Sequence, residues 1–496
     1  MGGFGTARVT LVCVGLAIGS CLLASTGTAA AKGSKPVISN FKAAPASVPS
    51  EGTVIVSATV SGAKECTLSS SKAVAGLPAT FSCESGNVNT GVLMPANTGK
   101  KAVKYKLRLI AVASTGGKSK AKATVSVSPA VPRTATVVAA GYNNVNGDYT
   151  CARLSTGHVE CWGYNTYGEL GDGKTTYSGT PVEVLGITEA TQVTAGAGQS
   201  CALLSTRHID CWGYNPDGEL GDGTTTTKDT PVEVLGITDA IHVAAGNLDT
   251  CAVLSTGHVK CWGYNGFGEL GDGSSTGPEA CFSGESCSKT PVEVMNIAEA
   301  TQVTNGGQNT CARLSNGHVE CWGQGPLDHG TTTHSDTPVE ALGVTQATQV
   351  TAASSDTCTR LSTGPIECWG GNQYGQLGDG ETTTSATPKK VSGITEATWV
   401  TAGWFDTCAV VSNSHVECWG INGEGELGNG KTGNPSDTPV KVSGISEASQ
   451  VTAGRDHACA RLSTGHIECW GNNQYGQLGD GEAGNESDTP KKVKGI

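Results

Sequence analysis

Short runs of alternating apolar and polar residues recur between residues 134 and 496. Thr191 to Gly196 alternates as a half-buried strand does, and Cys201 to Leu204 and His208 to Gly213 predict two further strands on either side of a tight turn. A glycine-rich loop follows, and Pro231 to Leu235 predicts a fourth strand. Because no stretch shows sustained helical periodicity, we expect each unit to be a small four-stranded sheet in an all-β chain.

This unit is repeated seven times with a period of about 50 residues, which is typical of propellers and solenoids. The copies open at Cys151, Cys201, Cys251, Cys311, Cys358, Cys408 and Cys459. A four-stranded sheet with two apolar faces must pack against its neighbours. Seven such units closing in a ring predict a seven-bladed β-propeller.

Every copy contains the triplet Cys-Trp-Gly, and five of the seven continue into a fuller pattern such as W-G-Y-N-P-D-G-E-L-G-D-G, from Trp212 to Gly223. Kelch and WD repeats carry other motifs. Residues 134–496 resemble the regulator of chromosome condensation repeat. The resemblance implies the propeller fold. It leaves the ligand open, because members similar to this chain include a nuclear guanine-nucleotide exchange factor that docks on chromatin and a secreted bacterial inhibitor of class A β-lactamases.

Fourteen of the 20 cysteines occupy paired repeat positions ten residues apart. If residues 154–158 form a three-residue hairpin loop with Gly157 in the left-handed conformation, Cys151 lies directly opposite Cys161 at a narrow, non-hydrogen-bonded site. Arg207 and Ser414 replace this glycine in two copies, which predicts a strained turn or another turn type. Zinc is disfavoured, because the spacing lacks close C-x2-C pairs, and we expect no metal site.

Disulfides are therefore predicted, and without Cys13 and Cys21 near the N-terminus the remaining 18 cysteines are even in number. The expected pairs are Cys66 with Cys83, Cys151 with Cys161, Cys201 with Cys211, Cys251 with Cys261, Cys281 with Cys287, Cys311 with Cys321, Cys358 with Cys368, Cys408 with Cys418, and Cys459 with Cys469. Disulfides at this density indicate an oxidising compartment.

Residues 1–31 predict a secretory signal peptide, with Arg8 before the apolar run from Val9 to Ala24 and a small-residue cleavage site after it. In a second interpretation, Ile18 to Cys21 is a lipobox and an acylated Cys21 anchors the protein to a membrane. Both place the protein outside the cell or on its surface. No other apolar stretch is long enough to span a bilayer, so we expect no membrane span.

Residues 35–129 differ in composition, being rich in Val, Ala, Ser and Thr with alternating runs typical of strands. They resemble a small immunoglobulin-like β-sandwich. The core tryptophan of that fold is missing, because the first tryptophan of the chain is Trp162. We expect this module to precede the propeller as a spacer or docking domain.

The formal net charge of -12, with only 32 Lys and Arg, argues against nucleic acid as a partner. Gly273 to Gly277 matches G-x-S-x-G, but in a propeller loop it lacks the strand-turn-helix context of a catalytic serine. The turn histidines lie in different copies and the Asp-Gly pairs suit tight turns, so neither predicts a metal. We therefore expect no enzyme, no cofactor and a monomer.

The positions where the copies differ are those that blade packing leaves free. The loop before each first cysteine is such a place, and equivalent loops must emerge on one face of the ring. The candidate binding residues there are Tyr142, Asn143, Asp148, Trp404, Phe405, Arg455 and Asp456. Phe282, near the tip of an insertion bracketed by Cys281 and Cys287, is a further candidate. Alternatively, Trp404 fills a gap at the channel mouth and the insertion is a tolerated surface loop.

The sequence thus predicts a secreted or surface-tethered scaffold that binds a protein or a glycan through one propeller face. An enzyme inhibitor is the first alternative. A guanine-nucleotide exchange factor is the second and is disfavoured by the secretory leader. A purely structural surface protein is the third.

Overall fold

The computed structural model of this 496-residue chain describes residues 35–48, 53–84, 86–95, 97, 101–128, 133–142, 147–276, 278–281, 284, 286–325 and 334–496. These residues fall into two compact units, which divide between residues 132 and 133. Within the described ranges, no helix has the length and hydropathy needed to cross a membrane. The predicted leader, including Cys21, lies outside the described residues.

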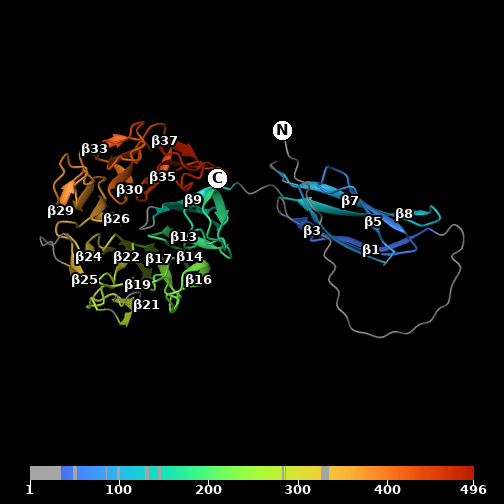
Figure 1. Ribbon diagram of the computed structural model, residues 1–496, viewed down its shortest axis with the longest axis horizontal. Coiled ribbons are helices and arrows are strands. Elements are labelled where there is room, and N and C mark those ends of the chain that lie inside the picture. Colours follow the sequence, from blue (N-terminus) through green and yellow to red (C-terminus); the bar gives the residue numbers. More distant parts are fainter. Residues whose placement is uncertain are drawn as a thin grey trace. The chain divides into compact units, whose positions relative to one another are not determined.

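The N-terminal unit is built from two β-sheets (Figure 1). One sheet has the strand order β1 (Val37–Ala44), β3 (Thr53–Ser61), β6 (Asn87–Leu93). The other has the order β2 (Ser47–Val48), β8 (Lys118–Val127), β7 (Val103–Val112), β4 (Glu65–Ser70), β5 (Ala79–Ser82). Their inner faces share one core, which contains the Cys66–Cys83 disulfide. The two-sheet arrangement agrees with a sandwich, and the immunoglobulin-like assignment stays a prediction.

The C-terminal unit is a seven-bladed β-propeller whose blades each contribute four strands in chain order. The first strands are β9 (Ala135–Gly141), β13 (Ala190–Ala195), β17 (Ala240–Ala245), β22 (Ala300–Asn305), β26 (Ala347–Ala352), β30 (Ala397–Ala402) and β34 (Ala448–Ala453). The second strands are β10 (Tyr149–Leu154), β14 (Gln199–Leu204), β18 (Asp249–Leu254), β23 (Asn309–Leu314), β27 (Asp356–Leu361), β31 (Asp406–Val411) and β35 (His457–Leu462).

The third and fourth strands complete each blade. The third strands are β11 (Val159–Gly163), β15 (Ile209–Gly213), β19 (Val259–Tyr264), β24 (Val319–Gly323), β28 (Ile366–Gly370), β32 (Val416–Gly420) and β36 (Ile467–Gly471). The fourth strands are β12 (Ser178–Glu183), β16 (Lys228–Glu233), β21 (Ser286–Glu293), β25 (Ser335–Glu340), β29 (Ser385–Lys390), β33 (Ser436–Lys441) and β37 (Ser487–Lys492). The insertion of the third blade adds β20 (Glu279–Ala280), which pairs with β21.

The first strand of every blade faces the centre of the ring. Residues of all seven first strands line one central cavity of about 650 Å³. The last blade lies beside the first, so the ring is closed (Figure 1). Each blade is a complete sequence repeat, and among the described residues no strand crosses the closing seam.

The cysteine pairs of the repeats are cross-strand disulfides within one hairpin. Cys151 faces Cys161 in the register of β10 and β11, and their Cα atoms are 4.0 Å apart, as expected at a narrow non-hydrogen-bonded site. The other repeat pairs have Cα distances of 4.0 or 4.1 Å, and Cys281 is bonded to Cys287. All nine predicted pairings are present.

The hairpin turn is conserved in geometry even where its glycine is missing. Gly157 has a φ of 85°, and Arg207 and Ser414 adopt φ values of 67° and 62° at the same position. The closing hydrogen bond is also the same, since the Leu204 amide donates to the His208 carbonyl as the Leu154 amide does to His158. Of the two alternatives left open by the sequence, the structure therefore shows the same turn held in a strained conformation.

The hydrophobic cores of the propeller lie between blades. Cys161 and Trp162 are adjacent in β11 and point to opposite faces of the sheet. Cys161 packs in the core shared with the second blade, whereas Trp162 packs in the core shared with the seventh. Each Cys-Trp pair thus contributes one side chain to the core on either side of its blade. All seven repeat tryptophans are fully buried.

The tryptophans also explain the E-L-G part of the motif. In six blades the indole Nε1 donates to the backbone carbonyl of the Glu or Gln in the preceding blade's loop, at 2.7 or 2.8 Å. The following glycine has no room for a side chain, because a Cβ at Gly221 would lie 2.9 Å from the Trp262 Nε1. Trp369 follows the shortened fourth blade, and its Nε1 has no partner among the described residues.

A second set of contacts joins the first strands of adjacent blades. Four glutamines accept from the N–H and donate to the carbonyl of one valine in the next blade, at 2.8 to 3.1 Å, so each side chain imitates a paired backbone amide. The pairs are Gln192 with Val243, Gln302 with Val350, Gln349 with Val400, and Gln450 with Val138. The last of these pairs crosses the closing seam.

We expect Arg207→Gly and Ser414→Gly each to raise the free energy of unfolding by about 1 kcal/mol, because glycine adopts the left-handed conformation without the steric cost of a Cβ. Denaturant unfolding of the oxidised protein measures this. The matched control is Gly257→Ser, which should destabilise, since a Cβ there would lie 2.4 Å from the Ala298 carbonyl oxygen. An unchanged or lowered stability for both glycine variants would contradict the strained-turn interpretation.

Candidate binding face at the channel mouth

The loops between the first and second strands form one mouth of the central cavity. Their backbones are joined across seams: the Trp404 amide donates to the Gly454 carbonyl of the next blade at 2.9 Å, and the Tyr142 amide donates to Gly196 at 3.0 Å. Ala197, Asn247 and Gly307 make the equivalent bond in their blades. These loops are therefore held by the ring, and their side chains are presented from a rigid base.

Aromatic side chains from separate blades meet at this mouth. The Tyr142 ring lies 4.8 Å from the Trp404 ring, edge to face, and Trp404 lies 6.0 Å from Phe405. Tyr374, from the loop after β28, lies 5.0 Å from Phe405, and the Arg455 guanidinium lies 5.6 Å from the centre of the Trp404 ring. We call Tyr142, Tyr374, Trp404, Phe405 and Arg455 the aromatic cluster. The structure thus brings together four of the predicted binding residues.

These rings are partly exposed and partly packed. Tyr142 and Trp404 line the central cavity, and Trp404 and Phe405 are half-buried. Burial raises the pKa of the Tyr142 hydroxyl, and the nearby carboxylates of Asp249 and Asp148 act in the same direction. Trp404 therefore both packs at the channel mouth and presents apolar surface there.

Tyr374 was missed because the sequence analysis compared the copies only at the loop before the first cysteine. The loop after the third strand also varies, with Tyr167, Asp217, Phe267, Tyr374, Glu424 and Tyr475 at one equivalent position. Comparing the copies at this second position would have shown it.

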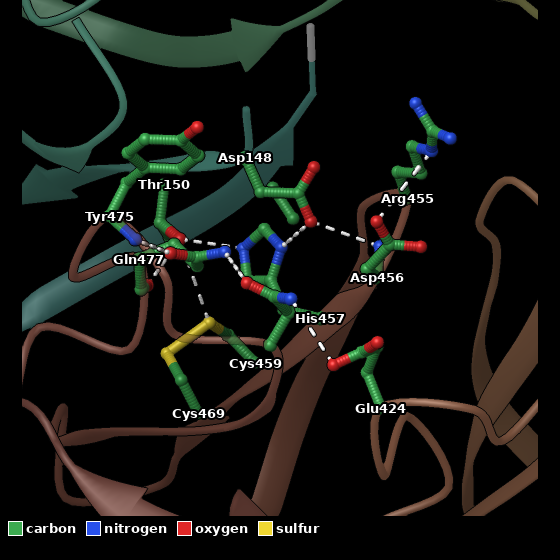
Figure 2. A network of polar contacts seen from close by, with 12 residues as sticks. Asp148, Thr150, Glu424, Arg455, Asp456, His457, Cys459, Cys469, Tyr475 and Gln477 are labelled. Atoms are coloured by element: carbon green, nitrogen blue, oxygen red, sulfur yellow. Dashed lines mark hydrogen bonds and ion pairs between the residues drawn. A yellow bond between two sulfur atoms is a disulfide. The ribbon is translucent and has the colours of Figure 1, made fainter. Parts of the chain in front are cut away.

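A polar network lies beside the aromatic cluster, at the seam between the seventh and first blades (Figure 2). The Asp148 Oδ2 lies 2.8 Å from the His457 Nδ1 and accepts a hydrogen bond from the Asp456 amide at 2.9 Å. Arg455 and Asp456 form an ion pair at 3.6 Å. Burial raises the pKa of Asp456 to about 6, with the Asp148 carboxylate adding to the rise and Arg455 opposing it.

Asp148, His457 and Thr150 follow the order of a carboxylate, an imidazole and a hydroxyl in a catalytic triad. The His457 Nε2 lies 2.9 Å from the Thr150 Oγ1. Thr150 is fully buried, however, and donates its one hydroxyl proton to the Gln477 carbonyl at 3.0 Å. The Thr150 hydroxyl therefore has no proton to give to Nε2 and is not activated as a nucleophile.

This network is a buried link that closes the ring. Asp148 is 1 % exposed and His457 is 1 % exposed. Asp148 was predicted as a binding residue because its loop varies between copies. The structure corrects this interpretation, since its carboxylate faces His457 inside the seam and is closed to a ligand. The residue at this position therefore reflects the packing of the closing seam.

The other sequence candidates are placed as follows. Asn143 and Phe282 lie outside the described residues. Four turn histidines pair with glutamates of the fourth strands at 2.6 to 2.8 Å: His158, His208, His258 and His318. In the described part of the chain, no three His, Cys, Asp or Glu side chains converge as metal ligands.

Several carboxyl groups are buried in the loops of this face. Burial raises the pKa of Asp249 to about 7 and of Glu269 to about 8, and it raises that of Glu219 well above its ordinary value. The equivalents of Glu269 in two other blades are Gln376 and Gln477. Glutamine is therefore accepted at this position, where one side-chain oxygen accepts a hydrogen bond from a backbone amide of its own loop.

This geometry can be compared with that of known proteins. A ring of seven repeats with varied loops on one face defines a β-propeller scaffold. Models of the regulator of chromosome condensation (RCC1) repeat match residues 156–203, 211–253, 240–269, 368–410, 415–461 and 448–477. These matches show that the propeller contains RCC1 repeats. No curated protein sequence matches the chain.

Solved structures support the same fold. The structure titled "Crystal structure of Kap60 bound to yeast RCC1 (Prp20)" matches with a TM-score of 0.57 and 19% identity over 68% of this chain and 83% of that chain. Prp20p from Saccharomyces cerevisiae gives 0.58 and 19% over 73% and 88%. Human WBSCR16 gives 0.58 and 19% over 68% and 89%. At this identity the likeness is one of fold.

We expect the free energy of unfolding to fall as pH rises from about 5 to 9. Below the ordinary pKa of glutamate, near 4.3, these carboxyls are protonated in both states. Above it, the unfolded chain releases protons that the buried groups retain up to their raised pKa values. Glu219→Gln and Glu269→Gln should each recover roughly 1–3 kcal/mol at pH 9 and flatten the profile. The exposed Glu396→Gln is the control, and equal profiles for all variants would contradict the prediction.

We expect His457→Ala to lower the free energy of unfolding by about 3–5 kcal/mol, because it leaves the Asp148 charge buried without its partner. Adding Asp148→Asn should restore part of this loss. His258→Ala removes a half-exposed pair with Glu293 and should cost less than about 1 kcal/mol. Denaturant unfolding measures all three. Equal effects of His457→Ala and His258→Ala would show that the closing link contributes little.

Proposed function

We propose that this chain is an exported, non-enzymatic scaffold that binds a protein through the channel mouth. The observation that carries the proposal is the aromatic cluster, which gathers Tyr142, Trp404 and Arg455 from three blades onto one face. Tyr, Trp and Arg are the side chains most enriched at the energetic centres of protein interfaces. A rigid base lowers the ordering cost of binding.

The disulfides support export. Nine pairs stabilise the two units, and cross-links at this density persist in oxidising compartments. An exported protein does not meet a nuclear GTPase or chromatin, which disfavours the exchange-factor alternative. The net charge of -12 also opposes binding to nucleic acid.

The relatives support a protein as the ligand. The titles of the similar structures report Prp20 bound to Kap60, and its binding properties to Gsp1p and histones. These partners belong to those proteins, and what carries over is the use of the propeller as a protein-binding surface. A glycan remains the alternative ligand, since partly exposed aromatic rings also stack on sugars.

We expect a partner captured from secreted and surface fractions to bind the parent and not the Trp404→Ala, Phe405→Ala double variant. Removing two interface aromatics should weaken binding at least tenfold, a loss of about 1.4 kcal/mol or more. Titration of the purified partner against each variant measures this.

The matched control is Leu235→Ala, which removes an apolar side chain that is 50% exposed elsewhere on the propeller. Equal affinity of the parent and the double variant would exclude the aromatic cluster as the binding site. Inhibition of an enzyme by the captured complex would favour the inhibitor alternative, and loss of binding after deglycosylation of the partner would favour a glycan.

A further inference from the structure

A second cavity, of about 290 Å³, opens on the same face, on the other side of the ring from the aromatic cluster. Its walls come from the loops of the second, third and fourth blades. Asn247 and Leu248 belong to the loop before β18, and Gly307 belongs to the loop before β23. We call this space the acidic cavity.

Three buried carboxyl groups line it, namely Asp217, Asp249 and Glu269. No lysine or arginine is among its described lining residues. Lys289 packs beside Gly218, and its ammonium group is paired with Glu279 at 3.1 Å. The described lining of the cavity is therefore acidic.

Two oxygen atoms in this lining have no hydrogen-bond partner among the described residues. They are the Glu269 Oε1, in a residue that is 3% exposed, and the Asn247 Oδ1. The Asp249 Oδ2, by contrast, accepts hydrogen bonds from Asn305 and Thr310. Burying an acceptor without a donor costs free energy, so the lining favours an occupant that brings N–H groups.

Another pair of blades shows one group that can lie at the equivalent position. Three blades further on, the equivalents of Asn247, Leu248 and Asp249 are Trp404, Phe405 and Asp406. The equivalent of Gly307 is Arg455, whose guanidinium lies over Trp404 and pairs with Asp456. At the position of Gly307 in the fourth blade, the seventh blade thus places an arginine against the neighbouring loop.

The residues that line the cavity also select the chemistry of the occupant. The carboxyls do not converge as metal ligands, since the described residues contain no group of three acidic, His or Cys side chains placed to hold an ion. A guanidinium group has five N–H donors that diverge in one plane and stacks on aromatic and apolar surfaces. Tyr264 and Leu248 provide such surfaces in the lining.

We propose that the acidic cavity binds the guanidinium group of an arginine side chain presented by the partner protein. That the arginine comes from a partner protein rests on the proposed function. The cavity's preference for a guanidinium group does not rest on it. The aromatic cluster and the acidic cavity are then two contact points on one face.

The test is a calorimetric titration with N-acetyl-arginine methylamide, using N-acetyl-citrulline methylamide as the neutral probe of similar shape. We expect the arginine probe to bind the parent and the citrulline probe to bind at least tenfold more weakly. No binding of the arginine probe, or equal binding of both, would overturn the proposal. No partner is needed, so failure here is distinct from failure of the aromatic cluster.

Glu269→Gln is the site variant, because Gln376 and Gln477 show that the fold accepts glutamine at this loop position. This substitution should weaken binding of the arginine probe at least tenfold. Glu426→Gln is the matched control, since it makes the same change at the equivalent position of the sixth blade, outside the lining. Equal effects of the two variants would overturn the proposal. Agmatine tests a free cation as the source, and tighter binding of agmatine than of the capped arginine would overturn the partner-protein form.

Discussion

The tryptophan that each blade buries against its predecessor is the contact on which the propeller depends. A four-stranded sheet of this size has two apolar faces and cannot bury either of them alone. The adjacent Cys and Trp of the third strand point to opposite faces, so one dipeptide contributes to two seams. The indole also donates to the preceding blade's loop, which fixes the E-L-G segment in place. The packing between blades therefore requires the same residues that define the sequence motif.

The closing seam has the same contacts as the others but no covalent connection. Gln450 and Trp162 cross it with the usual hydrogen bonds, and the buried Asp148 and His457 pair is added to them. The aromatic cluster lies next to this seam, and the acidic cavity lies at the opposite seams. One face thus carries Arg455 against the aromatic cluster on one side and the acidic cavity on the other.

The repeat made most of the fold predictable. Strand positions, the Cys151 to Cys161 pairing and the ring of seven blades followed from spacing alone, because each repeat reports the same packing again. The equivalence of the loops predicted that Tyr142, Trp404 and Phe405 lie on one face, and the contact between Tyr142 and Trp404 is an addition from the structure.

The features that the sequence could not predict depend on contacts between the repeat copies. Comparison of the repeats shows that Asp148 and His457 are unusual, but not that they face each other inside a seam. At Arg207, steric cost alone does not decide between a strained turn and another turn type, since the surrounding strands set the outcome. The acidic cavity was hidden for a further reason. Its lining comes from the loops of three blades, and a cavity is a property of these loops together.

The repeat disulfides each join residues ten positions apart, and none of them crosses a seam. The probability that two cysteines of an unfolded chain meet falls with the length of chain between them. The native partner is therefore also the nearest in sequence for every repeat cysteine, and each hairpin can oxidise before the rest of the ring exists. Correct disulfide pairing is therefore a local property of each hairpin. It does not depend on the order in which the blades emerge and assemble.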